Sequence, residues 1–149
     1  MDIKLACKKY GLDAVPLFWE TSESYLRKIY NGAGPNDFNY AIQCILGYIH
    51  PELTIDAAEE LLRKRITSFL NLFEPCVAIH DFDFLYSDKT KETFNLVNNR
   101  LYSNMIRIID KEYPLKKFWL WGQRIKWKGK AKITFLACDG FGWDAWLNN

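Results

Sequence analysis

The sequence predicts a mainly helical fold, and two observations lead to that prediction. Apolar residues recur at steps of three and four along most of the chain, which is the spacing of one helix face. Alternation typical of a strand is weak and confined to the stretch from Lys130 to Phe135, which leaves a small β-hairpin open there. The length of 149 residues suits one domain, and we expect residues 1–149 to form it.

Three helices are expected in the middle of the chain. The first runs from Ile55 to Phe73, with Thr54 as its N-cap. Pro75 suits the first turn of a helix, so a second helix is expected to begin there. A polar turn at residues 87–89 separates it from a third helix, whose apolar stripe consists of Phe94, Val97, Leu101, Met105 and Ile108. The second and third helices would form an antiparallel helical hairpin, with the additional helices around it.

The composition is that of an ordinary soluble globular protein, with 49% hydrophobic and 26% charged residues. No apolar run approaches the roughly 18 residues that span a bilayer, and the first residues lack the apolar core of a secretory signal peptide. Four scattered cysteines without a CxxC pair predict reduced thiols. We therefore expect a protein of a cytoplasm or of an assembled particle, with no signal peptide or transmembrane segment.

The predicted hairpin places a histidine and an asparagine at nearly the same level along the two helix axes. His80 lies eight residues before Asp88 in the turn, and Asn98 lies ten residues after it. At a rise of about 1.5 Å per residue, the two positions differ by less than one helical turn. Asn98 also falls on the apolar stripe, where a polar side chain needs a partner. A hydrogen bond between His80 and Asn98 would satisfy both.

Asp81 follows His80 and points about 100° further round the helix. His80 would then face an inner partner while Asp81 faces a neighbouring loop, an arrangement that suits a general base beside a metal ligand. Two other interpretations stay open. His80 would be a satisfied core residue, or it would share a zinc ion with Cys76 and with His50 or Asp139.

A glycine-containing stretch before these helices is either a simple turn or a backbone site for a ligand. Tyr30, Gly32 and Gly34 have the spacing Y-x-G-x-G. Glycine lets backbone carbonyls turn inward, and calcium takes carbonyl and carboxylate oxygens as ligands. Such a loop needs a carboxylate from elsewhere in the chain, and Asp81 is the candidate.

The combination of Y-x-G-x-G with a later C-x-x-x-H-D resembles the phospholipase A2 family. It is similar in particular to a set of short phage and prophage proteins. The residues that carry the resemblance are NGAGP at 31–35, CVAIHDFDF at 76–84, VNNRLYSNM at 97–105 and CDGFGWDAW at 138–146. The resemblance implies a phospholipase A2-like helical hairpin core and a protein of the host bacterium's cytoplasm or of the virion.

The resemblance also implies roles for individual residues. His80 would be the general base that activates a water molecule. Asp81 would hold a calcium ion (Ca²⁺) together with the carbonyls of Tyr30, Gly32 and Gly34. The ion would polarise the ester carbonyl of a phospholipid and stabilise the oxyanion. The expected function is therefore calcium-dependent hydrolysis of a lipid ester.

Two departures from the family's pattern favour an alternative. Asn98 stands where the family has an aspartate that orients the histidine, and Phe84 stands where it has a tyrosine. Asparagine accepts a hydrogen bond but carries no charge to stabilise an imidazolium. Activity would then be attenuated. Alternatively, the chain is an inactive phage or prophage protein of the same fold, with a structural or host-interaction role.

A basic, tryptophan-rich segment lies between Pro114 and Lys132. It holds no acidic residue and seven basic ones: Lys116, Lys117, Arg124, Lys126, Lys128, Lys130 and Lys132. Such a segment suits a phospholipid membrane surface, a phage assembly or host protein, or, less well, nucleic acid. It equally suits a helix whose aromatic residues enter the core. The candidate surface residues are Trp119, Trp121, Arg124, Trp127 and Lys128.

Overall fold

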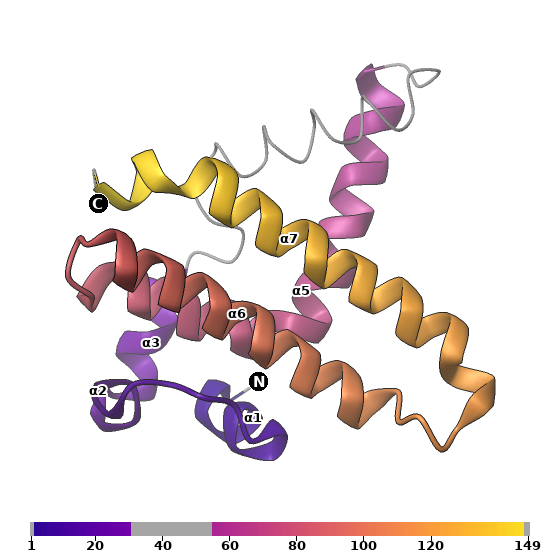
Figure 1. Cartoon of the computed structure of the whole chain (residues 1–149), viewed down its shortest axis with the longest axis horizontal. Helices are drawn as coiled ribbons and strands as arrows, with labels where there is room; N and C mark the ends of the chain where they lie inside the picture. The colour runs from indigo at the N-terminus through magenta and orange to yellow at the C-terminus, as the bar shows by residue number, and fades with distance from the viewer. Residues whose placement is uncertain (1, 31–54, 148–149) are drawn as a thin grey trace.

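The computed structural model describes residues 2–30 and 55–147, with side chains in the second range from Asn71 onward except those of Phe141 and Ala145. The described residues are mainly helical and contain no strand, which confirms the predicted fold class (Figure 1). The elements are α1 (Ile3–Tyr10), α2 (Pro16–Glu20), α3 (Glu23–Ile29), α5 (Ile55–Tyr86), α6 (Lys91–Glu112), the 3-10 turn η1 (Phe118–Leu120) and α7 (Trp121–Leu147).

The β-hairpin left open around Lys130 to Phe135 is wrong, because this stretch lies inside α7. Trp127 and Ala131 are buried, and Phe135 packs against Tyr102 of α6 with ring centroids 5.4 Å apart. These three positions are four residues apart, so they share one face of a helix. Packing of that face against α6 outweighs the weak alternation that suggested a strand.

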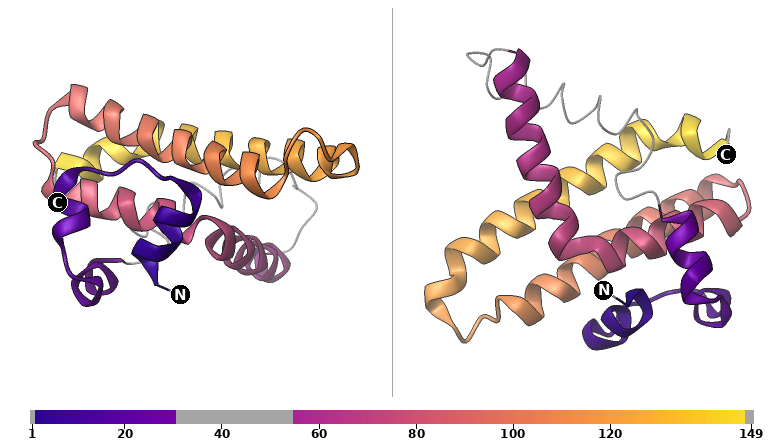
Figure 2. Two further views of the ribbon diagram at one scale, coloured as in Figure 1. Left: turned by 90° about the horizontal axis from the view of Figure 1, so that it is seen from below. Right: turned by 180° about the vertical axis from the view of Figure 1, so that it is seen from behind.

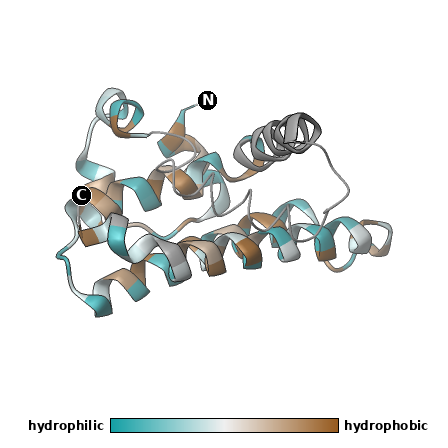
Figure 3. Cartoon of the chain, turned by 90° about the horizontal axis from the view of Figure 1, so that it is seen from above, coloured by the Kyte–Doolittle hydropathy of each residue, from teal (hydrophilic) through white to brown (hydrophobic). Residues whose placement is uncertain are grey.

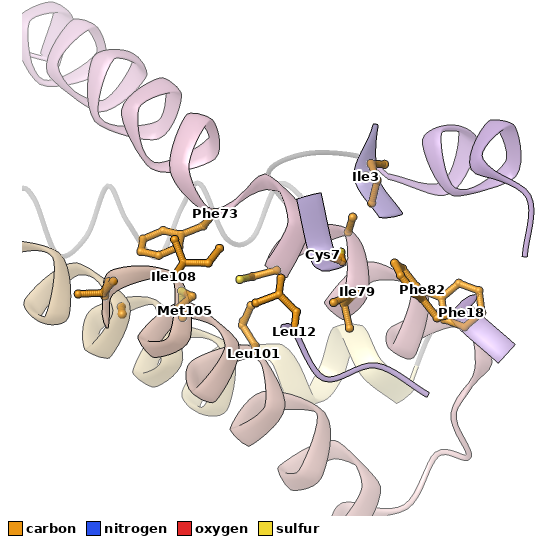
Figure 4. Packing of buried hydrophobic residues seen from close by; sticks show 14 of the residues in the cluster. Ile3, Cys7, Leu12, Phe18, Phe73, Ile79, Phe82, Leu101, Met105 and Ile108 are labelled. Atoms are coloured by element: carbon orange, nitrogen blue, oxygen red, sulfur yellow. The ribbon is translucent and has the colours of Figure 1, made fainter. Parts of the chain in front are cut away.

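The predicted helix boundary at Pro75 is also wrong. Helix α5 continues through this residue for 32 residues in all. It bends in its middle, near Phe73 (Figures 2 and 4). Proline donates no backbone hydrogen bond and its ring displaces the preceding turn, so it bends a helix that packing keeps continuous. The expected N-cap Thr54 lies outside the described residues.

The part of α5 after the bend and helix α6 run antiparallel, and α7 packs along α6 (Figures 1 and 2). Residues 87–90 form the turn between the first two, one residue longer than the predicted turn at 87–89. Thr90 caps α6, because its Oγ1 accepts a hydrogen bond from the backbone N–H of Thr93 at 3.2 Å. Hydrophobic and hydrophilic residues alternate along the long helices (Figure 3), as expected for helices with one buried face.

The main core joins the N-terminal helices to α5 and α6 (Figure 4). It holds Ile3 and Cys7 of α1 and Phe18 of α2, each fully buried. Phe18 packs edge-on against Phe82 of α5, with ring centroids 5.5 Å apart. No described helix is both long enough and apolar enough to cross a bilayer.

Polar residues of α6 hold the segment that follows α1. The Asn104 side chain accepts from the Asp13 backbone N–H at 2.9 Å and donates to the Asp13 carbonyl at 2.7 Å. Arg100 donates to the Asp13 carboxylate at 3.1 Å, and Arg107 donates to the Gly11 carbonyl at 2.8 Å. Gly11 has a φ of 63°, the left-handed conformation that ends α1. Helix α6 therefore positions the N-terminal segment through hydrogen bonds as well as apolar contacts.

We expect the substitution Asn104→Ala to lower the free energy of unfolding by about 2 kcal/mol, because Asn104 is fully buried and the change removes both hydrogen bonds that hold the Asp13 backbone. Urea unfolding followed by circular dichroism would measure the loss. Asn99→Ala is the matched control, because Asn99 is exposed on the same helix and should change stability by less than about 0.5 kcal/mol. Equal losses in the two variants would contradict this role of Asn104.

Candidate functional site

The predicted contact between His80 and Asn98 is present. His80 Nε2 lies 3.1 Å from Asn98 Oδ1, across the interface of α5 and α6. Because an amide oxygen only accepts, His80 donates its Nε2 proton and its Nδ1 keeps a lone pair. Asn98 is fully buried, and its Nδ2 has no hydrogen-bond partner among the described residues. The contact therefore fixes both the orientation and the tautomer of the imidazole.

The environment of His80 favours the neutral imidazole. Burial lowers the pKa of His80 to about 4, and the hydrogen bond that His80 donates to Asn98 opposes this only in part. At neutral pH His80 therefore carries no proton on Nδ1 and is able to accept one. A base with such a low pKa is weak, because proton transfer is most efficient when the pKa lies near the working pH.

A cluster of aromatic side chains adjoins His80 through Phe84. Phe84, one helical turn after His80, lies 5.1 Å from it between ring centroids. Phe84 also packs edge-on against Trp146 of α7, at 4.7 Å, and Trp146 packs against Phe94 at 5.7 Å. Trp146 is fully buried, and its Nε1 has no hydrogen-bond partner among the described residues. The closing motif CDGFGWDAW thus reaches the His80 region through α7, which linear spacing does not predict.

The structure describes two of the four predicted calcium ligands, Tyr30 and Asp81. Gly32 and Gly34 lie outside the described residues. Tyr30 follows α3, which packs against α5. Burial and, to a smaller extent, the negative charges of Glu74 and Asp81 raise the pKa of Tyr30 to about 12. Tyr30 is partly buried and packs against the main core, to which α5 contributes.

The donor types at Tyr30 and Asp81 fit a hard cation such as calcium, because they are a backbone carbonyl and a carboxylate. The described residues contain no group of three or more His, Cys, Asp or Glu side chains arranged to hold a metal ion. The zinc alternative therefore has no such group in residues 2–30 and 55–147, and His50 lies outside them. Cys76 is fully buried, and burial raises the pKa of its thiol well above the usual value.

Cys138 is a further residue of this region that sequence reasoning missed. It lies on α7, where burial raises the pKa of its thiol to about 12, with smaller contributions from the charges of Asp81 and Asp139. Cys138 packs against the main core, and Trp146 of the same helix contacts Phe84 of α5. The only sequence signal for this was the position of Cys138 at the start of the closing motif.

The predicted surface residues divide into two groups. Trp119 and Trp121 are 66% and 53% exposed, and Lys128 is partly exposed. Arg124 and Trp127 are only 8% exposed, so they do not belong to the surface.

The contacts of these two residues explain the correction. Arg124 pairs with Asp110 of α6 at 2.5 Å and donates to the Tyr113 carbonyl at 2.8 Å. Trp127 packs edge-on against Phe73 of α5, with ring centroids 5.5 Å apart. Both lie on the face of α7 that is turned toward the other long helices.

Comparisons with protein-family models, with curated proteins and with solved structures give no significant match to this chain.

We expect stability to decrease as the pH falls from 6.5 toward 4. In this range the unfolded chain binds a proton at His80, whose ordinary pKa is 6.5, while the folded chain does not. The free energy of unfolding should therefore be about 2 kcal/mol lower at pH 5 than at pH 7.5 on account of His80. Urea unfolding at the two pH values measures the difference.

His80→Gln is the control for this measurement, because glutamine keeps an N–H donor for Asn98 but does not titrate. This variant should lose that part of the pH dependence. The same dependence in both proteins would show that His80 is not the group responsible.

Proposed function

We propose that this protein hydrolyses a lipid ester in a calcium-dependent reaction, with His80 as the general base. The observation that carries the proposal is the bond from His80 Nε2 to Asn98 Oδ1 at 3.1 Å. It leaves the Nδ1 lone pair available to take a proton from water, and the low pKa of His80 keeps that atom unprotonated at neutral pH. Neither a covalent acyl-enzyme nor a nucleophilic side chain is required.

The hydrolysis is slow because the partner of His80 is the uncharged Asn98. When Nδ1 takes the proton, the imidazole becomes a cation in a largely apolar environment. The Asn98 amide orients the ring but supplies no negative charge to stabilise that cation. The proposed activity is therefore attenuated relative to a site with a carboxylate at this position.

Asp81 would hold calcium with the backbone carbonyls of Tyr30, Gly32 and Gly34. Tyr30 packs against the core to which α5, the helix that carries Asp81, contributes, and this packing supports the set of ligands. A bound calcium ion supplies a Lewis acid for an ester carbonyl. The role of the chain is to present the carboxylate one residue after the base, so that water and ester are held next to each other.

A second candidate function keeps the fold without the chemistry. Here the chain is a phage or prophage protein with a structural or host-interaction role, located in the host cytoplasm or in the virion. The neutral partner Asn98 favours it, because the site then lacks the charge that supports a histidine base. The packing of Phe84 between His80 and Trp146 also favours it, since those contacts stabilise the fold without any reaction.

Hydrolysis of short-chain phosphatidylcholine in the presence of calcium tests the two candidates. We expect slow release of fatty acid by the natural chain and none above background by His80→Ala. Asn98→Asp should raise kcat by at least about tenfold, because a carboxylate stabilises the imidazolium that forms. The matched control is Asn99→Asp, which adds the same charge at an exposed neighbouring position. Hydrolysis that persists in His80→Ala would remove the proposed mechanism.

Calcium binding is tested separately by thermal unfolding. A saturating ion should stabilise the folded chain by about 2.7 kcal/mol at a concentration 100 times its Kd. Asp81→Asn should abolish the shift, whereas Glu92→Gln, which removes an exposed carboxylate of α6, should keep it. No shift in the natural chain, or the same shift in Asp81→Asn, would show that Asp81 is not a calcium ligand.

A further inference from the structure

The connection between α6 and α7 forms one end of the molecule's long axis (Figure 1). Five large apolar side chains within eleven residues of sequence are exposed there. Their exposed fractions are 65% for Leu115, 70% for Phe118, 66% for Trp119, 53% for Trp121 and 72% for Ile125. Single exposed apolar residues are ordinary, but a contiguous group of this size marks a contact surface. We call these five residues the apolar tip.

Hydrogen bonds hold the backbone of the apolar tip in place. Trp121 donates from Nε1 to the Leu115 carbonyl at 2.9 Å. Arg124 ties the start of α7 to the end of α6 through Asp110 at 2.5 Å and the Tyr113 carbonyl at 2.8 Å. Phe118 and Trp119 pack edge-on, with ring centroids 5.3 Å apart. The exposure of the tip is therefore built into the fold.

The surface is shallow. A hollow of about 280 Å³ lies between Leu115, Trp121, Arg124, Ile125 and Lys128. Pockets for small ligands are usually deeper and larger, roughly 300–1,000 Å³. The apolar tip thus suits contact with an extended surface better than capture of a small molecule.

Positive charge predominates around the apolar tip. Four lysines accompany it: Lys116, Lys117, Lys126 and Lys128. No acidic residue lies between Pro114 and Lys132, and the nearby Asp110 is paired with Arg124. Within the part of the chain that the structure describes, none of these four lysines forms an ion pair, so their charges are available to an anionic partner.

We propose that the apolar tip and its four lysines dock onto an anionic phospholipid surface. Tryptophan and phenylalanine enter the headgroup region, and lysine stems reach lipid phosphates from the same level. Nucleic acid fits less well, because the segment's one arginine is engaged by Asp110 and because Leu115 and Ile125 offer no ring for base stacking. The docking does not rest on hydrolysis at His80.

Flotation with lipid vesicles in the presence of EDTA tests the proposal without turnover. We expect binding to vesicles of phosphatidylcholine with phosphatidylglycerol, no binding to phosphatidylcholine alone, and weaker binding at high salt. The double variant Phe118→Ser, Trp119→Ser should lose binding. The double variant Lys116→Gln, Lys117→Gln should bind at least about tenfold more weakly, because each lysine near an anionic surface contributes about fivefold.

The matched control is Leu5→Ser with Lys8→Gln on α1, since Leu5 is 68% exposed and Lys8 is also exposed. This variant should bind as the natural chain does. Quenching by lipids brominated along their acyl chains adds a test that needs no loss of binding. Trp119→Phe should reduce the quenching, because Trp119 then no longer reports from the interface.

Several results would overturn the proposal. They are no flotation with anionic vesicles, equal flotation of the natural chain and both tip variants, or equal loss in the control on α1. Binding to an oligonucleotide that the lysine variant loses, without flotation, would assign the surface to nucleic acid. A dimer that dissociates in Phe118→Ser, Trp119→Ser would assign it to a second copy of the chain. His80→Ala should float normally, so failure of docking and failure of hydrolysis are distinguished.

Discussion

The burial of α6 against both α5 and α7 is the constraint on which the rest of the described structure depends. Helix α6 has its most extensive contacts with these two helices and also contacts α1. Met105, Ile108 and Ile109 are fully buried, so the helix contributes to the core along much of its length. Contacts with α6 determine the antiparallel course of α5 and the placement of α7. They also determine where the N-terminal segment docks.

Polar groups on α6 select among the arrangements that apolar burial alone would allow. Arg100 pairs with Asp83 of α5 at 2.5 Å and with Asp13 at 3.1 Å, and Asp83 is only 1% exposed. Burial holds the pKa of Asp83 above its usual value, against the attraction of Arg100. Such a pair adds little net stability but is costly to break. It therefore fixes which turn of α5 faces α6, and with it the register that places His80 opposite Asn98.

The candidate site and the apolar tip lie far apart on the same hairpin of α6 and α7. Asn98 is fourteen residues before the end of α6 at Glu112, which corresponds to about 20 Å along the helix. Docking at the tip and chemistry at His80 therefore use different residues. The proposed binding surface is equally compatible with a lipid-hydrolysing protein and with an inactive protein that contacts a membrane.

The sequence by itself determined the helical class, a turn at residues 87–89 and the bond between His80 and Asn98. These depend on periodicity and on counting residues across one short turn, where the helical rise leaves little freedom. The other features depended on tertiary structure, because the spacing of residues in the sequence does not encode them. Packing kept α5 continuous through Pro75, and the face of α7 turned toward α5 and α6 buried Arg124 and Trp127 while leaving Trp119 and Trp121 exposed. Trp146 came into contact with Phe84, the neighbour of His80, and Cys138 joined the main core for the same reason, because contacts between helices distant in sequence depend on three-dimensional packing.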